Sequence, residues 1–327
     1  MAAHGSMPRD RILMRSPAPS VLAGILVACQ ASGAAAPRRQ AGSPRMVELL
    51  KRITEQSNPE NNPFRNAERA ELLGESIKER GEATPRELRN LAVELLNAGK
   101  TSEAIAILGR IEEMMRARKT DPRSRPWIEI RSQQAVANLR WAEESNCTMH
   151  HNPRSCLFPI RGSGVHTQKE GSQAAVAILS ELLEQNPDDL KSRWLLNVAY
   201  MTLGEYPDGV PSRWLLDPKL FESDYDIGDF PDIAGELGLD VNDNAGGSIV
   251  EDFDGDGYLD IMASAMGLKS QLRYFHNNAD GSFTERTQES GLTGFTGGLN
   301  IVQADYNNDA RPPLLVLGGG WVGKGGG

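Results

Sequence analysis

Basic residues and cysteines are both scarce in this chain. Its 327 residues include 35 Lys and Arg against 44 Asp and Glu, for a net charge of −9, and only three cysteines. A nucleic-acid partner would require a basic face, so this balance argues against one. A Cys-x-x-Cys-His motif for haem attachment is absent. The apolar run at residues 21–28 is too short to span a bilayer as a mature helix.

That apolar run is instead typical of an export signal. Basic residues precede it, and it ends in Leu-Val-Ala-Cys at residues 26–29, which resembles the lipobox of bacterial lipoproteins. We therefore predict a signal peptide with a lipobox over residues 1–29, lipidation of Cys29, and a lipid anchor in the cell envelope. The alternative is an ordinary signal peptide, cut after Ala28 or at residues 34–36, and a secreted protein. Residues 30–45 are rich in Ala, Gly, Ser and Pro, which predicts a flexible linker.

Helical periodicity dominates residues 46–206. Apolar residues recur there at three- and four-residue spacing, and Thr84 and Glu87 are placed as a capping box. The segments predicted as helices are residues 46–56, 68–80, 85–98, 101–115, 172–185 and 190–203. The tryptophans of the helical and linker regions are expected in the core or in helix packing rather than in a ligand site: Trp127, Trp194 and Trp214.

One pair of these helices, residues 85–98 and 101–115, resembles a tetratricopeptide repeat (TPR). Ala92 is small enough for close helix approach, Gly99 turns the chain, and Ala104 receives the first helix. Generic antiparallel helical hairpins are the alternative. In either case a helix pair buries its apolar face only against a neighbour, so we predict a TPR-like helical domain over residues 46–206.

A loop containing cysteine and histidine interrupts the helices at residues 146–166. Cys147 and Cys156 are an even pair, and in an oxidising compartment a disulfide between them is predicted. The alternative is a metal site that also uses the histidines of this loop, His150, His151 and His166.

Acidic residues crowd the stretch that follows the helices. Residues 217–260 contain fourteen Asp and Glu against one base, Lys219. Residues 207–229 are irregular and are predicted as an acidic linker between two domains. Beyond it the period changes, and short strands are expected at residues 247–253, 259–265 and 271–276, with a hairpin turn at residues 277–281.

The centre of this acidic stretch is Asp-Phe-Asp-Gly-Asp-Gly-Tyr-Leu-Asp at residues 252–260. Because Asp252, Asp254 and Asp256 alternate in a glycine-containing turn, their carboxylates can converge. Asp260 closes the cluster from the next strand, and the carbonyl of Tyr258 should supply another oxygen. Hard oxygen ligands in this number suit Ca²⁺. We predict a calcium site formed by these five residues.

Other interpretations of this loop are weaker. An EF-hand needs a Glu at the twelfth loop position, which is Ala263 here, and flanking helices where strands are expected. A solvated Asp/Gly turn without metal is the remaining alternative. A second copy of the loop, with Asp305, Asn307 and Asp309, has Pro313 in place of its closing carboxylate and is predicted to bind metal weakly or not at all.

An internal repeat with an offset of 53 residues links the two copies of the loop. Residues 230–239 match residues 283–292, and residues 252–256 match residues 305–309 at the same offset. Repeats of this length built from short strands are typical of a propeller blade or a similar array.

The loop and residues 272–292 resemble the FG-GAP/VCBS repeats of integrin-α-type propellers, and more closely bacterial proteins of the ASPIC/UnbV (cartilage acidic protein-like) family. Some members carry a helical repeat region before the propeller. The resemblance covers residues 230–317 and implies a calcium-stabilised β-propeller used for extracellular binding or adhesion, without established catalysis. Residues 230–327 hold about two blades, whereas a propeller closes with about four or more. The chain is therefore expected to be a C-terminally truncated member.

These features predict an α+β multidomain, exported protein that is not an enzyme. It would bind Ca²⁺ and use helical repeats and propeller loops to bind a protein or glycan partner. Two alternatives stay open: a polysaccharide-active propeller enzyme whose catalytic blades are missing here, and a periplasmic assembly factor that acts through its helices.

Overall fold

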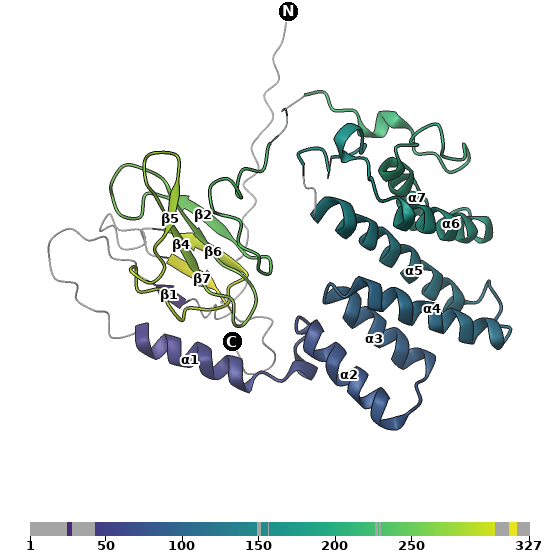
Figure 1. The fold of residues 1–327 in the computed structure, drawn as a ribbon, viewed down its shortest axis with the longest axis horizontal. Coiled ribbons are helices and arrows are strands. Elements are labelled where there is room, and N and C mark those ends of the chain that lie inside the picture. The colour runs from purple at the N-terminus through teal and green to yellow at the C-terminus, as the bar shows by residue number, and fades with distance from the viewer. Residues whose placement is uncertain are drawn as a thin grey trace, which may run out of the picture.

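The computed structural model describes residues 25–27, 43–148, 152–155, 157–225, 228, 230–304 and 314–318. Within these residues seven α-helices precede all strands of two small antiparallel sheets except β1 (Ile25–Val27), so the protein is α+β, as predicted (Figure 1). Cys29, Cys156, His150, His151 and the second loop copy with Asp305, Asn307, Asp309 and Pro313 lie outside the described residues.

Six of the helices form one array in which each packs on the next in sequence (Figure 1). They are α2 (Asn66–Arg80), α3 (Pro85–Asn97), α4 (Thr101–Ala117), α5 (Arg125–Glu143), α6 (Glu170–Gln185) and α7 (Leu190–Leu203). The predicted helices are confirmed, with ends that shift by at most three residues. Helix α5 was not predicted as a separate element.

Small side chains set the close contact between α3 and α4. Ala92 on α3 is buried in one core cluster with Leu108 of α4, and Ala104 on α4 is buried in another with Leu95 of α3. Gly99 turns the chain with φ of 75°, a left-handed conformation that costs glycine little. The packing roles predicted for these residues are confirmed.

The capping box at the start of α3 is also confirmed. The Thr84 hydroxyl accepts from the Glu87 amide at 3.3 Å, and the Thr84 amide donates to the Glu87 carboxylate at 2.9 Å. The Thr84 amide first, and then Arg80 and the Thr84 hydroxyl, lower the pKa of the exposed Glu87 to about 2.

Glu87→Gln is therefore expected to show a pH-dependent loss of stability. Because the folded pKa lies below the ordinary value of 4.5, the carboxylate stabilises the fold above that pH and loses this effect as the pH falls toward about 2. Urea unfolding of both proteins at several pH values from neutral to acid should show two stabilities that converge. A difference that does not change with pH would contradict this.

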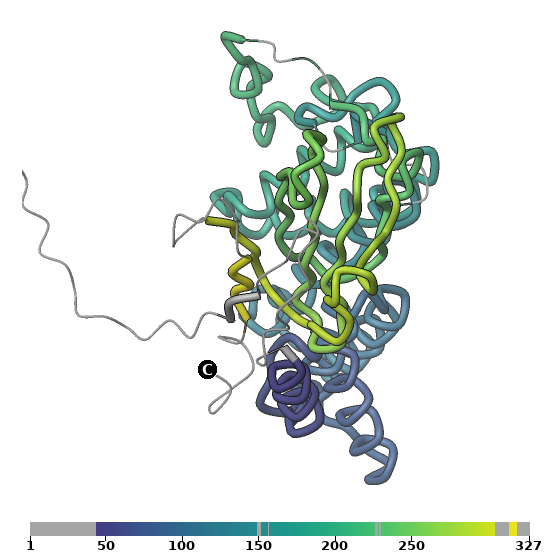
Figure 2. The backbone as a smooth tube through the Cα atoms, turned by 90° about the vertical axis from the view of Figure 1, so that its left-hand side faces the viewer, coloured from purple at the N-terminus to yellow at the C-terminus, as the bar shows by residue number. Residues whose placement is uncertain are grey.

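Helix α1 (Ser43–Gln56) packs on the sheets rather than on the helical array, although its sequence falls within the predicted helical domain. Met46, Val47 and Leu50 contact the β core, and the Thr54 hydroxyl donates to the Leu268 carbonyl at 3.0 Å. Figure 2 shows α1 in purple at the base of the strands, with the helical array behind them. The helix thus bridges the two parts of the chain.

The four-stranded sheet has the simple order β2-β3-β4-β5, a meander of antiparallel neighbours. Its strands are β2 (Ser248–Glu251), β3 (Asp260–Ala263), β4 (Arg273–Asn277) and β5 (Phe283–Glu285), so the three predicted strands are confirmed in shorter form. The predicted turn at residues 277–281 joins β4 to β5, and the Asn278 amide donates to the Ser282 carbonyl at 3.0 Å.

A second sheet has the order β1-β7-β6 and consists of β1 (Ile25–Val27), β6 (Asn300–Gln303) and β7 (Leu314–Leu317). Strand β1 belongs to the apolar run that was predicted to be part of an export signal, and it pairs antiparallel with β7. The two sheets approach closely, because a side chain at Gly247 beside β2 would meet the Ile301 amide of β6 at 2.8 Å.

The internal repeat is visible in the backbone. The Leu239 amide donates to the Ala234 carbonyl at 2.8 Å, and 53 residues later the Leu292 amide donates to the Thr287 carbonyl at 3.0 Å. The glycines that precede both leucines have left-handed φ values, 69° and 72°. The strand pair β2 and β3 is likewise followed by β6 and β7 at a similar spacing. The sequence repeat is therefore also a structural repeat.

Half of the segment predicted as an acidic linker is anchored to α7. Trp214 is buried in the core of α6 and α7, and its carbonyl accepts from Asn197 at 2.9 Å. The Leu216 amide donates to the Asn197 side chain at 3.0 Å. The short helix η4 (Pro218–Phe221) follows, so the chain leaves the helical array only after these contacts.

Candidate metal centre

The acidic loop connects β2 to β3, as predicted, and Asp252 organises its backbone. One oxygen of Asp252 accepts from the Gly255 amide at 2.7 Å and the Asp256 amide at 3.1 Å, and the other accepts from the Gly257 amide at 2.9 Å. Gly255 and Gly257 have φ values of 78° and 92°, which the tight turn requires. The loop is thus wound around its first carboxylate.

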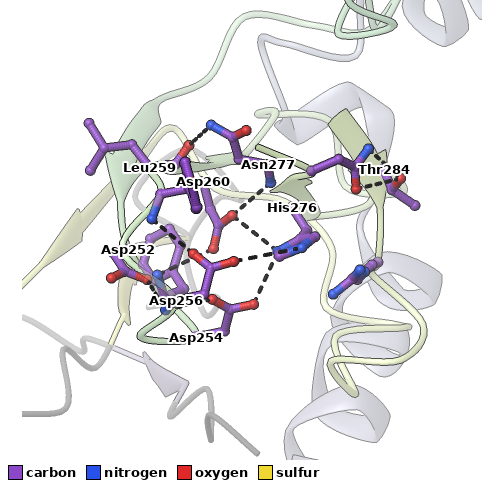
Figure 3. A network of polar contacts seen from close by, with 12 residues as sticks. Asp252, Asp254, Asp256, Leu259, Asp260, His276, Asn277 and Thr284 are labelled. Atoms are coloured by element: carbon purple, nitrogen blue, oxygen red, sulfur yellow. Dashed lines mark hydrogen bonds and ion pairs between the residues drawn. The ribbon is translucent and has the colours of Figure 1, made fainter. Parts of the chain in front are cut away.

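This winding brings three predicted ligands together. Asp252, Asp254 and Asp256 each offer a carboxylate oxygen, and these oxygens lie within 4.8 Å of one another (Figure 3). Asp252 and Asp254 are half-buried and Asp256 is exposed, so a cation could reach them from solvent. Carboxylates so close together repel unless a cation or protons compensate their charge.

Burial and two neighbouring carboxylates raise the pKa of Asp254. Partial burial is the largest cause of a raised pKa, and the charges of Asp260 and Asp256 raise it further, while His276 and the Asp256 amide oppose them. The ionised form of Asp254 is therefore disfavoured in the protein without a cation, and a bound cation would favour it.

Asp260 has a different environment from the three loop carboxylates. It is fully buried, and its Oδ2 accepts from the Tyr274 hydroxyl at 2.7 Å and the Phe253 amide at 3.3 Å. Its Oδ1 accepts from the Asn277 amide at 2.8 Å. Asp260 groups with Asp254 and His276 rather than with all three loop carboxylates. It therefore ties the loop to β4 in addition to any role as a ligand.

Residue-by-residue reading of the sequence missed His276. This side chain lies on β4 and faces the loop, with Nδ1 3.0 Å from Asp254 Oδ2 and 3.3 Å from Asp260 Oδ1 (Figure 3). The only available signal was strand pairing: Ile261 is opposite Phe275, so the next pair in this register is Asp260 and His276.

Other predicted site residues are less well defined by the geometry. The Tyr258 amide donates to Asp256 at 2.9 Å, whereas metal ligation by its carbonyl stays a prediction. In the loop at residues 146–166, Cys147 Sγ lies 3.7 Å from His166 Nε2. The Cys147–Cys156 disulfide stays a prediction because Cys156 lies outside the described residues.

The same loop borders a cavity of about 440 Å³ between α5 and α7. Cys147, His166 and Thr202 line it together with apolar side chains, among them Phe158 and Trp194. Burial lowers the pKa of His166. Trp194 is 42% exposed, and its ring centroid lies 5.5 Å from that of Phe158, with the two rings tilted by 57°. Of the two places expected for Trp194, the core is therefore excluded, and a role in helix packing stays a prediction. Trp127 and Trp214 are buried, as expected.

Comparison with known protein families identifies a repeat in the C-terminal part of the chain. Residues 228–316 match an FG-GAP-like repeat, which covers the acidic loop and both sheets except β1 and the end of β7. The searches of curated proteins and of solved structures found no significant match. Among the described residues, no helix combines the length and apolar character needed to cross a membrane.

Proposed function

We propose that this chain is an exported, non-enzymatic binding protein whose FG-GAP-like repeat is stabilised by Ca²⁺ at the loop between β2 and β3. The observation that carries the proposal is the convergence of Asp252, Asp254 and Asp256 within one turn of that repeat. All the ligand atoms that these residues offer are oxygens, which is the donor type that Ca²⁺ prefers.

The residues present fit a calcium ion. The Asp252 carboxylate is oriented by three backbone amides. Burial first, and then the charges of Asp260 and Asp256, raise the pKa of Asp254. A bound ion would offset the repulsion between these carboxylates and hold β2 and β3 at a fixed separation. The solvated turn without metal, by contrast, leaves the repulsion in place.

The finer assignments belong to the same proposal. The repeated turn and the repeated strand pair support successive blades of a β-propeller of the ASPIC/UnbV type. Sequential packing of helix pairs, with small residues between α3 and α4, supports TPR-like repeats. Export with lipidation at Cys29 is supported by the basic and apolar segments that precede it.

One specific observation supports partner binding at the helical array. The cavity between α5 and α7 opens beside an aromatic cluster. The ring centroid of Trp194 lies 5.5 Å from that of Phe158 and 6.0 Å from that of Phe221. Exposed aromatic side chains beside an apolar cavity are typical of ligand and partner sites. This also favours the second candidate, an assembly factor that acts through its helices.

Calorimetric titration of the whole chain with Ca²⁺ tests the metal site. We expect binding near one equivalent, and a loss of affinity on the order of a hundredfold in Asp254→Ala, because a central carboxylate ligand is removed. Glu289→Ala, an exposed position on a turn beyond β5, makes the same change in net charge and should bind like the wild type.

A folded wild-type protein that does not bind Ca²⁺ would refute the proposal. Equal loss of calcium affinity in Asp254→Ala and Glu289→Ala would show that the ion is attracted only by the net negative charge of the protein and not by a specific site.

A further inference from the structure

His276 is a buried imidazole that an all-oxygen calcium site does not use. The residue is only 7% exposed, and carboxylates from the loop and from β3 surround its ring (Figure 3). Nε2 lies 4.0 Å from Asp256 Oδ2, while Nδ1 faces Asp254 and Asp260. A buried ring nitrogen needs a partner, so its surroundings should show which partner it has.

The close contacts of Nδ1 are ion pairs when the imidazole is protonated, but they do not have hydrogen-bond geometry. Asp254 Oδ2 lies at 3.0 Å and Asp260 Oδ1 at 3.3 Å, yet Nδ1 takes part in no hydrogen bond among the described residues. Two ligands of one small divalent ion, each about 2.1 Å from the metal, are separated by about 3.0 Å in octahedral and about 3.4 Å in tetrahedral geometry. The separations of Nδ1 from both oxygens fall in this range.

Both oxygens retain electron pairs for a metal. The hydrogen bond from the Asp256 amide goes to Oδ1 of Asp254, at 3.3 Å, rather than to the Oδ2 that faces His276. Asp260 Oδ1 accepts one bond, from the Asn277 amide, and a carboxylate oxygen has a second lone pair. The Tyr274 hydroxyl holds the other oxygen of Asp260, which fixes the orientation of this ligand, as the outer partners of metal ligands do.

We propose that His276, Asp254 and Asp260 form a second cation site, which takes a divalent transition ion of the zinc and cobalt class. Imidazole nitrogen suits these ions, whereas Ca²⁺ takes oxygen ligands. The site shares Asp254 and Asp260 with the five residues predicted to bind Ca²⁺ and to that extent rests on the proposed function. Only His276 belongs to this second site alone. His276 and Asp260 come from the paired strands β4 and β3, so an ion here would link these strands directly.

Cobalt titration of the whole chain tests this site, because Co²⁺ gives a visible absorption spectrum that Ca²⁺ and Zn²⁺ do not. Zn²⁺ should displace the bound Co²⁺ with loss of the spectrum. In His276→Asn we expect an affinity for Co²⁺ and Zn²⁺ that is lower by at least about tenfold, because one of three protein ligands is lost. Calcium affinity should remain within about threefold, since Ca²⁺ does not need the imidazole.

Asp256→Asn is the matched control. It changes a carboxylate that contributes to the calcium group but not to the trio of His276, Asp254 and Asp260. Its calcium affinity should fall while its cobalt spectrum persists. The opposite responses of the two variants separate the two sites.

A second readout requires no variant. In the wild-type cobalt complex, proton NMR should show a strongly shifted, exchangeable imidazole N–H signal from the ligating histidine. Cobalt binding without this signal, equal cobalt affinity in wild type and His276→Asn, or no cobalt binding by the folded wild type would each overturn the proposal. A wild type that binds Co²⁺ but not Ca²⁺ would refute the calcium loop alone.

Discussion

Asp260→Ala is expected to lower the free energy of unfolding of the β region by about 3–5 kcal/mol, even without metal. The carboxylate is fully buried and accepts hydrogen bonds from the Tyr274 hydroxyl and from the Phe253 and Asn277 amides. Its removal leaves two buried donors, Tyr274 and Phe253, and the half-buried Asn277 amide without this acceptor, at about 1–3 kcal/mol for each buried donor, partly offset by relief of repulsion from Asp254.

Urea unfolding in a calcium chelator would measure this effect separately from metal binding. Asp256→Ala is the matched control, because it removes an exposed carboxylate of the same loop. Its stability without metal should change by less than about 0.5 kcal/mol, the usual range for a surface position. Similar losses in the two variants would show that Asp260 is no structural anchor and that the acidic loop contributes to stability only through its overall charge.

Gly171→Val is expected to destabilise the helical array by about 3 kcal/mol, through overpacking at a close helix contact. Gly171 lies in the first turn of α6, and a Cβ atom there would lie 2.6 Å from the Asn138 carbonyl oxygen and 2.9 Å from Ala142 Cβ, both on α5. The backbone of α5 cannot yield without separating the two helices, so the variant should unfold at lower urea concentration.

Gly109→Ala on α4 is the control for this variant. A Cβ atom at Gly109 would meet nothing within 4 Å. Replacing a glycine inside a helix by alanine then stabilises by about 0.5–1 kcal/mol, because the unfolded chain loses freedom. Opposite signs for the two substitutions, measured by thermal or urea unfolding, would confirm that Gly171 is required for packing and not for backbone conformation. A neutral Gly171→Val would contradict the close contact.

The part of the fold that was predicted correctly depends on local signals. Residues 190–203 form a helix over the predicted range, and Thr84 caps α3 as predicted, because periodicity and capping act within one or two turns. Helix α5 was missed as a separate element for a physical reason. It packs between α4 and α6. Large apolar side chains are buried only near its start, at Trp127 and Ile130, and the rest of its buried face consists of alanines and Gln134.

Local sequence patterns predicted one part of the metal centre, the converging carboxylates of the acidic loop, and missed another, His276. The alternation of Asp252, Asp254 and Asp256 with glycine predicted a turn in which the carboxylates converge, and they do converge. His276 follows Asp260 by sixteen residues, and no spacing rule connects them. The register of β3 and β4 places them opposite each other. Pairing of distant strands depends on the packing of the whole sheet, which local sequence does not specify.

The amino-acid sequence by itself determined the described helices other than α5, the strands β2, β3 and β4, and the loop between β2 and β3, because each depends on interactions between near neighbours in the chain. The 53-residue repeat is visible in the sequence directly. Tertiary structure alone decided that α1 packs on the sheets, that Trp194 borders a cavity and that His276 joins the acidic loop. These arrangements depend on which apolar faces pack against each other. Many segments of the chain have an apolar face, so local sequence does not specify which two faces meet.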